Sequence, residues 1–204
     1  MSRPSPFYRT LGVLSRPVEL LFRLRTSGVE NVPREGGGVL AANHTSNFDP
    51  WPLGLPLLPH RQLRFMGKAE LFNPFLRPIL NGAGAFPVRR GERDHEAIET
   101  AVRLARDGEL VVMFPEGTRA AKGLRKRHQA RPHTGAARIA LAAGVPLIPA
   151  AIRGADRLAR LGPLRVAYGP PIPLDDLAEL PPREAAEVAT DRLMAAIEQL
   201  KRTL

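Results

Sequence analysis

The 204-residue chain contains no cysteine, which excludes disulfide bonds, thiolate nucleophiles and cysteine-ligated metals and is compatible with a reducing compartment. Aromatic residues are also scarce, at 5% of the sequence against 44% for hydrophobic residues as a whole. The core must therefore consist mainly of Leu, Val, Ile and Ala side chains. This length and apolar content suffice for one α/β domain with a substantial core.

Long apolar runs are missing as well. A membrane-spanning helix needs ~20 consecutive apolar residues, and the most apolar window, 136–152, is interrupted by Arg138, Gly144, Pro146 and Pro149. The N-terminal segment never forms a continuous apolar core, so we expect no secretory signal peptide. The sequence therefore predicts neither a membrane span nor a secretion signal.

Acidic residues are outnumbered, since 30 Lys and Arg against 20 Asp and Glu give a formal net charge of +10. Such an excess favours an anionic partner, be it a nucleic acid, a phosphate-bearing substrate or an anionic lipid surface. The basic run 122–131 is the feature that best fits a nucleic acid. Aromatic side chains do not alternate with it, however, and no nucleic-acid-binding module is recognisable. We therefore expect no nucleic-acid partner.

The N-terminal segment is typical of amphipathic helix. Pro17 is tolerated best in the first turn of a helix, so we expect two short helices with a bend near Ser15 and Arg16. The segment could pack on the protein's own core or lie on an anionic membrane surface, because arginines surround its apolar face. We assign 1–25 to membrane-associating helices and 26–204 to the main domain. The apolar residues at helical spacing are Phe7, Leu11, Leu14, Val18, Leu21 and Phe22.

Beyond this segment, short apolar runs alternate with helical patterns. After an extended edge segment at 26–33, this alternation predicts an α/β fold with a mixed or mainly parallel sheet covered by helices. The expected strands are 39–42, 63–67, 83–88, 109–114, 147–152 and 164–168, and the expected helices are 51–58, 71–80, 94–107, 134–143 and 181–200.

The most distinctive stretch, 43–50, follows the buried run 39–42. It places His44 just beyond a strand end, with Asp49 a short loop away. Ligands of open α/β sheets usually bind at the carboxyl ends of strands. A neutral histidine is the natural general base near neutral pH, and a carboxylate on its other ring nitrogen fixes the tautomer and stabilises the imidazolium.

Spacing alone leaves two roles open for Asp49. Side chains separated by five positions do not share one helix face, so His44 and Asp49 can meet only if the loop turns back. An aspartate directly before Pro50 is also typical of a helix N-cap with proline at the first helical position. The two roles are compatible, because a carboxylate has two oxygens.

A covalent nucleophile is not expected. Ser46 lies in the same stretch, but the Gly-x-Ser-x-Gly pattern of a nucleophilic serine is missing. We therefore expect direct attack by a hydroxyl of the substrate, deprotonated by His44. Nor is a metal expected, because there is no His-Glu-x-x-His motif and the remaining histidines are scattered at positions 60, 95, 128 and 133.

Two further clusters follow predicted strands. Glu116 and Arg119 could bind a polyol hydroxyl and a phosphate, the arginine through paired hydrogen bonds, or they could form a structural ion pair in a turn. Arg89 and Arg90 precede Gly91, which could bring backbone close to an anion. The alternative for these two arginines is a solvated basic turn.

Taken together, these stretches resemble the 1-acylglycerol-3-phosphate acyltransferase family from Gly28 to about Pro173. Each block is modest evidence, but four blocks occur in the family's order. They are NHTSNFD at 43–49, which matches the His-x4-Asp motif, GAFPVRRG at 84–91, FPEGTR at 114–119 and VPLIP at 145–149.

The resemblance implies a glycerolipid acyltransferase-like fold with a membrane-associated N-terminal helical segment. It implies transfer of a fatty acyl group from acyl-CoA or acyl carrier protein, as co-substrate, to the free hydroxyl of lysophosphatidate, with no cofactor or metal. The implied location is the cytoplasmic face of the cell membrane, as a peripheral protein on an anionic lipid surface.

The resemblance also assigns the site residues. His44 would deprotonate the hydroxyl, and Asp49 would orient the histidine. The substrate-binding residues would be Arg90 and Arg119 at the phosphate and Glu116 at the glycerol, together with Gly117 and Thr118. Arg89 and His133 depart from the family's usual acidic residue and lysine, which leaves another lysophospholipid or a specialised lipid as the alternative acceptor.

Overall fold

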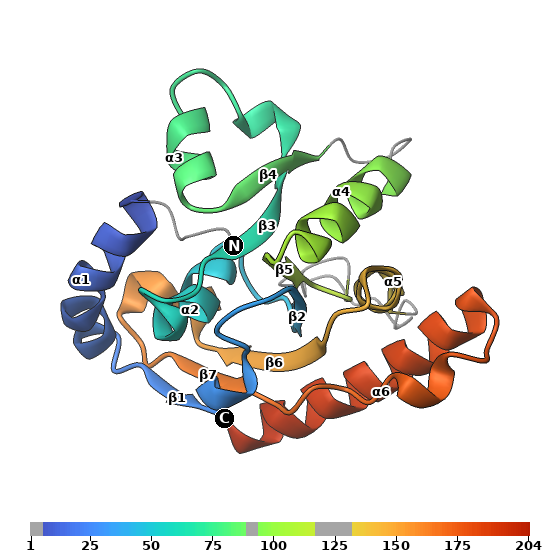
Figure 1. The fold of residues 1–204 in the computed structure, drawn as a ribbon. Coiled ribbons are helices and arrows are strands. Elements are labelled where there is room, and N and C mark those ends of the chain that lie inside the picture. The colour runs from blue at the N-terminus through green and yellow to red at the C-terminus, as the bar shows by residue number, and fades with distance from the viewer. Residues whose placement is uncertain (1–5, 89–93, 117–131) are drawn as a thin grey trace, which may run out of the picture.

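The computed structural model describes residues 6–88, 94–116 and 132–204. Within them, seven strands form one sheet in the order β1-β7-β6-β2-β5-β3-β4 (Figure 1). Neighbouring strands are parallel, except that β6 and β7 are antiparallel. The strands are β1 (Arg25–Ser27), β2 (Gly38–Ala42), β3 (Leu63–Lys68), β4 (Ala85–Val88), β5 (Leu110–Met113), β6 (Leu147–Arg153) and β7 (Arg165–Tyr168).

Helices cover both faces of this mixed sheet, as expected (Figure 1). The helices are α1 (Pro6–Leu21), α2 (Pro50–Gly54), α3 (Arg77–Gly82), α4 (Asp94–Arg106), α5 (Gly135–Ala143) and α6 (Pro182–Thr203). Short 3-10 segments are η1 (Val29–Asn31), η2 (Leu55–Leu57), η3 (Ala69–Leu71), η4 (Ala155–Arg160) and η5 (Asp175–Leu177).

Strand β2 shows how the two faces are built. Its side chains alternate between the faces because the strand repeat is two residues. Val39 and Ala41 belong to the core under α4, α5 and α6, whereas Leu40 and Ala42 belong to the core that includes Leu53 of α2. All of β2 is buried, so the strand reads as a continuous apolar run.

Two expected helices differ from the structure. The N-terminal segment forms one helix, α1, rather than two with a bend near Ser15, and Pro17 lies inside it. A proline removes one N–H donor from the helix, yet α1 continues beyond Pro17, and Phe22 N–H donates to Val18 O at its end (3.0 Å). The amphipathic and membrane-associating character of this segment, and the division at residue 25, remain predictions.

The second difference concerns the helical stretch 71–80, whose helix was expected to start near Asn73 and Pro74, whereas α3 begins at Arg77. The side-chain oxygen of Asn73 accepts the backbone N–H groups of Phe75 (3.1 Å) and Leu76 (2.9 Å). Asparagine often competes with helix formation in this way, by bonding to backbone groups two and three residues ahead. The chain therefore makes a turn before α3 starts.

The topology brings the carboxyl ends of three parallel strands to one edge of the sheet. β2 lies between β5 and β6, with Ala41 opposite Met113 of β5 and Ala42 opposite Ala150 of β6. The loop 43–49 therefore starts beside the end of β5 on one side and the last residues of β6 on the other.

At the opposite side of the sheet, where β2 and β5 begin, Arg61 joins the two chain segments that enter these strands. Its guanidinium donates to the carbonyl of Gly36, before β2, and to that of Gly108, before β5. Burial lowers the pKa of Arg61, while the nearby Glu109 and Glu35 act in the opposite direction. These bonds hold the amino ends of β2 and β5 in register, and so contribute to fixing where their carboxyl ends lie.

In the described part of the chain, helices that combine the length and the apolar character required to cross a bilayer are not found.

Candidate active site

The loop that follows β2 is anchored by its first residue. Asn43 is buried. Its amide nitrogen donates to Ile152 O (3.0 Å) and its amide oxygen accepts from Ile152 N–H (2.8 Å). An asparagine side chain offers both a donor and acceptors, so Asn43 satisfies both backbone groups of Ile152. The start of the loop is thereby fixed to β6.

The loop then turns back so that Asp49 reaches His44. Oδ2 of Asp49 lies 2.8 Å from His44 Nδ1 and accepts the backbone N–H groups of Thr45 (2.6 Å) and Ser46 (2.9 Å). Oδ1 accepts the hydroxyl of Thr45 (2.9 Å). The Asp49 side chain is fully buried, and these donors satisfy a carboxylate that would otherwise be costly to bury.

The same geometry decides the capping question. Asp49 does stand at the N-cap position of α2, with Pro50 next to it, but its side chain makes no capping hydrogen bond to the helix. Its backbone is already helical, at φ −53° and ψ −36°, unlike the extended conformation of most N-caps. The expected dual role was therefore wrong in this detail, because the carboxylate oxygens point back to the loop.

The imidazole of His44 is held on two sides. Its Nδ1 faces the Asp49 carboxylate, which favours the tautomer with the proton on Nδ1 and leaves Nε2 as the atom that can accept a proton. The ring stacks on Phe114, with centroids 4.3 Å apart and planes 19° apart. The His44 side chain is 15% exposed, so the base is fixed in place and still accessible.

Glu116 ties the two motif loops together. Its Oε2 accepts the backbone N–H of His44 at 3.3 Å, so the loop after β5 is bonded to the loop after β2. The structure therefore brings His44, Asp49 and Glu116 into one cluster. The remaining predicted site residues, at positions 90 and 117–119, lie outside the described residues: Arg90, Gly117, Thr118 and Arg119.

Sequence reasoning missed three contributors to this cluster. Phe114 and Thr45 belong to the recognised motifs, but their contacts with the His44 ring and the Asp49 carboxylate depend on the turn of the loop. Asn43 bonds to a residue 109 positions away, and a distant backbone partner leaves no local pattern. The one usable clue was a polar amide directly after a buried strand.

Ser46 does not compete as a nucleophile in this arrangement. Its Oγ accepts the backbone N–H of Phe48 (3.3 Å) and its own N–H donates to Asp49. Its hydroxyl thus takes part in the local turn. Among the described residues, no side-chain hydroxyl is bonded to the His44 ring. A histidine bonded to a buried carboxylate in this way is suited to deprotonating a group that arrives with the substrate.

Comparison with known proteins agrees with this chemistry. The profile of the family described as Acyltransferase matches residues 23–153, a span that starts before β1 and ends with β6. The chain belongs to the acyltransferase family. This acyltransferase is 34% identical over 179 residues to the 1-acyl-sn-glycerol-3-phosphate acyltransferase of Bacillus subtilis, covering 86% of each chain.

Other relatives are matched over part of their length. An uncharacterised protein of Mycobacterium tuberculosis is 32% identical over 67% of this acyltransferase and 39% of its own length. Among solved structures, the 1-acyl-sn-glycerophosphate (LPA) acyltransferase PlsC of Thermotoga maritima superposes with a TM-score of 0.66 and 22% identity, covering 95% of this chain and 79% of that one. This likeness confirms the predicted glycerolipid acyltransferase-like fold.

Proposed function

We propose that this acyltransferase moves a fatty acyl group from a thioester donor to the free hydroxyl of lysophosphatidate, giving phosphatidate for phospholipid biosynthesis. The observation that carries the proposal is the His44–Asp49 pair at the carboxyl edge of the sheet, joined by a 2.8 Å contact. The matched relatives add support, since that of B. subtilis is named for the same reaction.

In the proposed mechanism, Nε2 of His44 takes the proton of the acceptor hydroxyl as its oxygen attacks the thioester carbonyl. The buried negative charge of Asp49 stabilises the imidazolium that forms. The tetrahedral intermediate then collapses, the carbon–sulfur bond breaks, and the imidazolium returns its proton to the departing thiolate. The products are an ester and a free thiol, and the histidine is again neutral.

The acceptor's head group belongs, in this proposal, on the β5 side of His44. Glu116 would bind the glycerol region, with Gly117 and Thr118 beside it, and Arg90 and Arg119 would bind the phosphate. The support is that Glu116, with one oxygen on the His44 backbone, keeps a second oxygen for a hydroxyl. Another lysophospholipid or a specialised lipid is the alternative acceptor.

An apolar cavity next to the catalytic loop supports an acyl-chain substrate. It has a volume of about 160 Å³ and adjoins Pro50 and Trp51, which directly follow Asp49. This is below the ~300 Å³ at which ordinary ligand pockets begin, so it suits part of an acyl chain. Its other lining residues are Ser15, Val18, Gly54, Leu55, Leu58, Leu63, Phe65 and Ala83.

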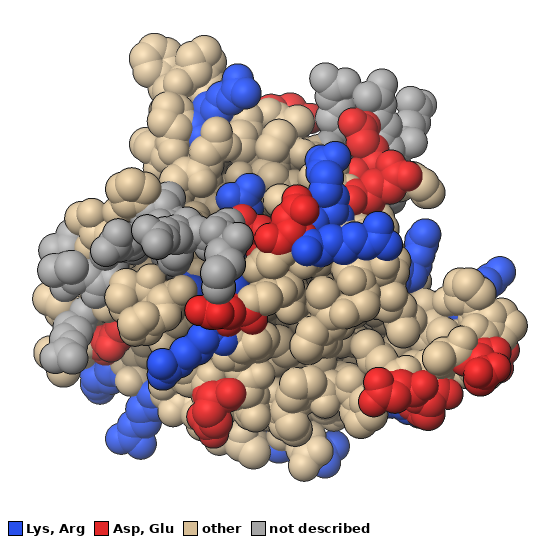
Figure 2. Space-filling view, viewed as in Figure 1, with Lys and Arg blue, Asp and Glu red and all other residues tan. Residues whose placement is uncertain are grey.

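We also propose peripheral attachment to the cytoplasmic face of the membrane, at an anionic lipid surface. Around α3 the protein exposes large apolar side chains, and Phe75 is 88% exposed. Helix α1 contacts α3, so both elements could meet the same bilayer, with Lys68 and Arg77 nearby. The surface over α3 is mostly uncharged (Figure 2). The exposed side chains of this region are Leu71, Phe75, Leu76 and Ile79.

The deciding experiment is release of free thiol from a long-chain acyl-CoA, with and without lysophosphatidate. The chain has no cysteine, so it adds no thiol background. We expect release by the wild type only with the acceptor, and ~100-fold lower kcat for His44→Ala, because a general base is lost. His95→Ala is the matched control, since that histidine is exposed on α4.

Full turnover by His44→Ala would refute the mechanism. Equal thiol release without acceptor would mean hydrolysis rather than transfer. If lysophosphatidate fails while another lysophospholipid succeeds, the acceptor assignment is wrong. Substituting acyl carrier protein for coenzyme A in the donor tests the carrier in the same assay.

Membrane attachment is tested by sedimentation with anionic liposomes. Phe75→Ser combined with Ile79→Ser removes exposed apolar surface without opening the core, and we expect weaker sedimentation of that variant. A chain lacking the residues before Thr26 tests α1 separately. Unchanged sedimentation of both forms would exclude these two elements as the attachment surface.

A further inference from the structure

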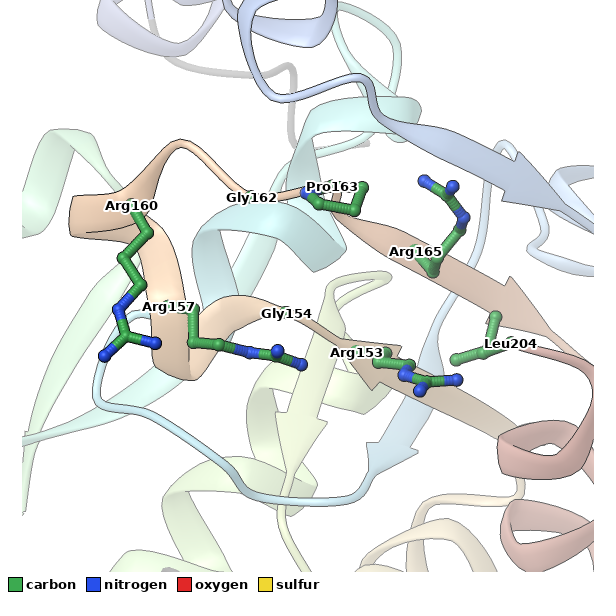
Figure 3. A pocket seen from close by; sticks show the side chains of 8 residues that line it. All are labelled: Arg153, Gly154, Arg157, Arg160, Gly162, Pro163, Arg165 and Leu204. Carbon is green, nitrogen blue, oxygen red and sulfur yellow. The ribbon is translucent and has the colours of Figure 1, made fainter.

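A second concave site lies where β6 ends and β7 begins. We call it the basic pocket, with a volume of about 430 Å³ (Figure 3). Three elements supply its arginines, namely the end of β6, the 3-10 segment η4 and the start of β7. The lining residues are Arg153, Gly154, Arg157, Arg160, Gly162, Pro163, Arg165 and Leu204.

Gly154 creates the shape of this pocket. It has φ of +96°, and a Cβ at this position would lie 2.4 Å from the carbonyl oxygen of Pro163. Only glycine tolerates both the conformation and the contact. The chain therefore turns sharply out of β6 into η4, so that the Arg157 side chain extends toward Arg153 (Figure 3), and both residues line the pocket.

The charges of the basic pocket are poorly balanced. Within the described residues, the one ion pair made by its arginines is between Arg157 Nε and Asp156 Oδ2, at 3.6 Å. Arg165 Nη1 donates to the backbone carbonyls of Arg23 and Leu164, both at 3.0 Å. Because these acceptors are neutral, they do not neutralise the positive charge of Arg165. A concave surface with several cations of one sign attracts an anion.

Phosphate is the anion that best fits these groups. The planar guanidinium makes paired hydrogen bonds to phosphate oxygens, and Arg153 and Arg157, which come from different elements, can each contact a phosphate. The pocket's volume of about 430 Å³ falls within the ~300–1,000 Å³ of sites for organic ligands. The pocket therefore suits a phosphorylated organic group better than a single inorganic ion.

The basic pocket is connected to the active site. Arg153 directly follows Ile152, whose backbone N–H and C=O are both bonded to Asn43, the residue before His44. The pocket lies on the β6 and β7 side of β2, whereas Glu116 lies on the β5 side. The proposed acceptor and a ligand in the basic pocket would thus approach His44 from opposite sides.

We infer that the basic pocket binds the phosphate groups of the donor's carrier, as a coenzyme A thioester presents them in its phosphorylated nucleotide. This inference rests on the proposed acyl transfer and extends it to the choice of donor. A donor molecule bound there by its phosphates would extend along the edge of the sheet, with its thioester toward His44. The same phosphate chemistry occurs in anionic lipid headgroups, so the test separates the two sources.

The first measurement is calorimetric binding of adenosine bisphosphate, the phosphorylated nucleotide portion of coenzyme A, which requires no turnover. Arg153→Gln combined with Arg160→Gln removes two exposed cations, and we expect Kd to rise by ~10-fold or more, since charge-assisted hydrogen bonds to phosphate are lost. Arg183→Gln is the control, because it removes another exposed arginine charge, at the N-terminal end of α6.

The second measurement compares two donors in the acyl-transfer assay. The ratio of kcat/KM for acyl-CoA to that for acyl-pantetheine, which lacks the nucleotide, should fall ~10-fold in the double variant, as loss of phosphate contacts predicts. An unchanged ratio would overturn the inference. So would a loss confined to acyl carrier protein as donor, because that would make the pocket a protein-docking surface.

Vesicles containing anionic phosphatidylglycerol separate the lipid source. If the double variant loses vesicle binding and keeps the wild-type Kd for the nucleotide, the pocket binds lipid and the donor assignment is wrong. Failure of the proposed function gives a different result. If nucleotide binding depends on Arg153 and Arg160 but no lysophospholipid is acylated, the pocket is a nucleotide-binding site and the proposed reaction is wrong.

Discussion

Asn43 binds both backbone groups of Ile152, accepting its N–H and donating to its C=O. The neighbours of these two residues are His44 and Arg153, so this buried pair of hydrogen bonds fixes the proposed base relative to the basic pocket. A displacement of β6 would be transmitted to the His44 loop through Asn43. The Asn43–Ile152 hydrogen bonds therefore connect the proposed active site to the basic pocket.

Replacing Asn43 by Ala should impair stability and turnover together. The backbone groups of Ile152 would be left buried without these partners, and each such loss costs ~1–3 kcal/mol. Urea unfolding monitored by circular dichroism measures the stability, and the thiol-release assay measures kcat. Thr190→Val is a useful comparison, since it removes a buried side-chain hydrogen bond in α6, away from the site. Normal kcat in Asn43→Ala would show that the loop holds its position without this bond.

Asp49→Asn should separate charge from architecture. An amide can keep its oxygen toward the N–H groups of Thr45 and Ser46, while its nitrogen donates to the Thr45 hydroxyl. The loop should therefore hold, with a melting temperature close to that of the wild type. The imidazolium, however, would lose its anionic partner, and kcat should fall ~100-fold or more. Asp49→Ala should lose both stability and activity.

Glu116 has a structural bond to His44 N–H and a proposed bond to the acceptor. Glu116→Gln retains an acceptor oxygen for the backbone, so His44 should stay in place. If the carboxylate also binds the glycerol region, this variant should raise the KM for lysophosphatidate several-fold, because a charge-assisted hydrogen bond becomes a neutral one. Steady-state kinetics with each substrate varied in turn measures this. An equal change in the donor KM would contradict the acceptor role.

Gly154→Ala should destabilise the turn between β6 and η4. A positive φ costs a non-glycine residue ~1–3 kcal/mol, and the added Cβ would meet the Pro163 carbonyl at 2.4 Å. We expect a lower unfolding midpoint in urea and weaker binding of adenosine bisphosphate, because η4 must shift. Gly162→Ala is the matched control, since a Cβ there meets nothing within 4 Å. Equal behaviour of the two variants would contradict this account of the pocket.

The sheet and most helices could be predicted because their apolar runs are buried. β2 appears in the sequence as an unbroken apolar run, β6 as an apolar run with one proline, and α4 as a helical repeat. The predicted helix over 71–80 started too early because Asn73 forms a turn by bonding to nearby N–H groups. Side-chain bonds of this kind override an apolar pattern that looks helical.

The site was predictable to the extent that it is local in the chain. A short motif identifies His44 and Asp49, but their contact depends on a loop reversal that the backbone N–H groups of Thr45 and Ser46 stabilise. The basic pocket was not foreseen. Arg153 and Arg165 belong to different strands, and only their antiparallel pairing brings them opposite each other.

The pairing of β1 with β7 has a consequence for how the chain is made. Arg165 bonds to Arg23 across 142 residues of sequence, and β1 depends on β7 as its neighbour in the sheet. Contacts between such distant segments form late, because a long loop must close first. During translation, β1 would therefore leave the ribosome long before β7 and would stay without its strand partner until β7 is synthesised, whereas α1 can pack earlier, on η2 and α3.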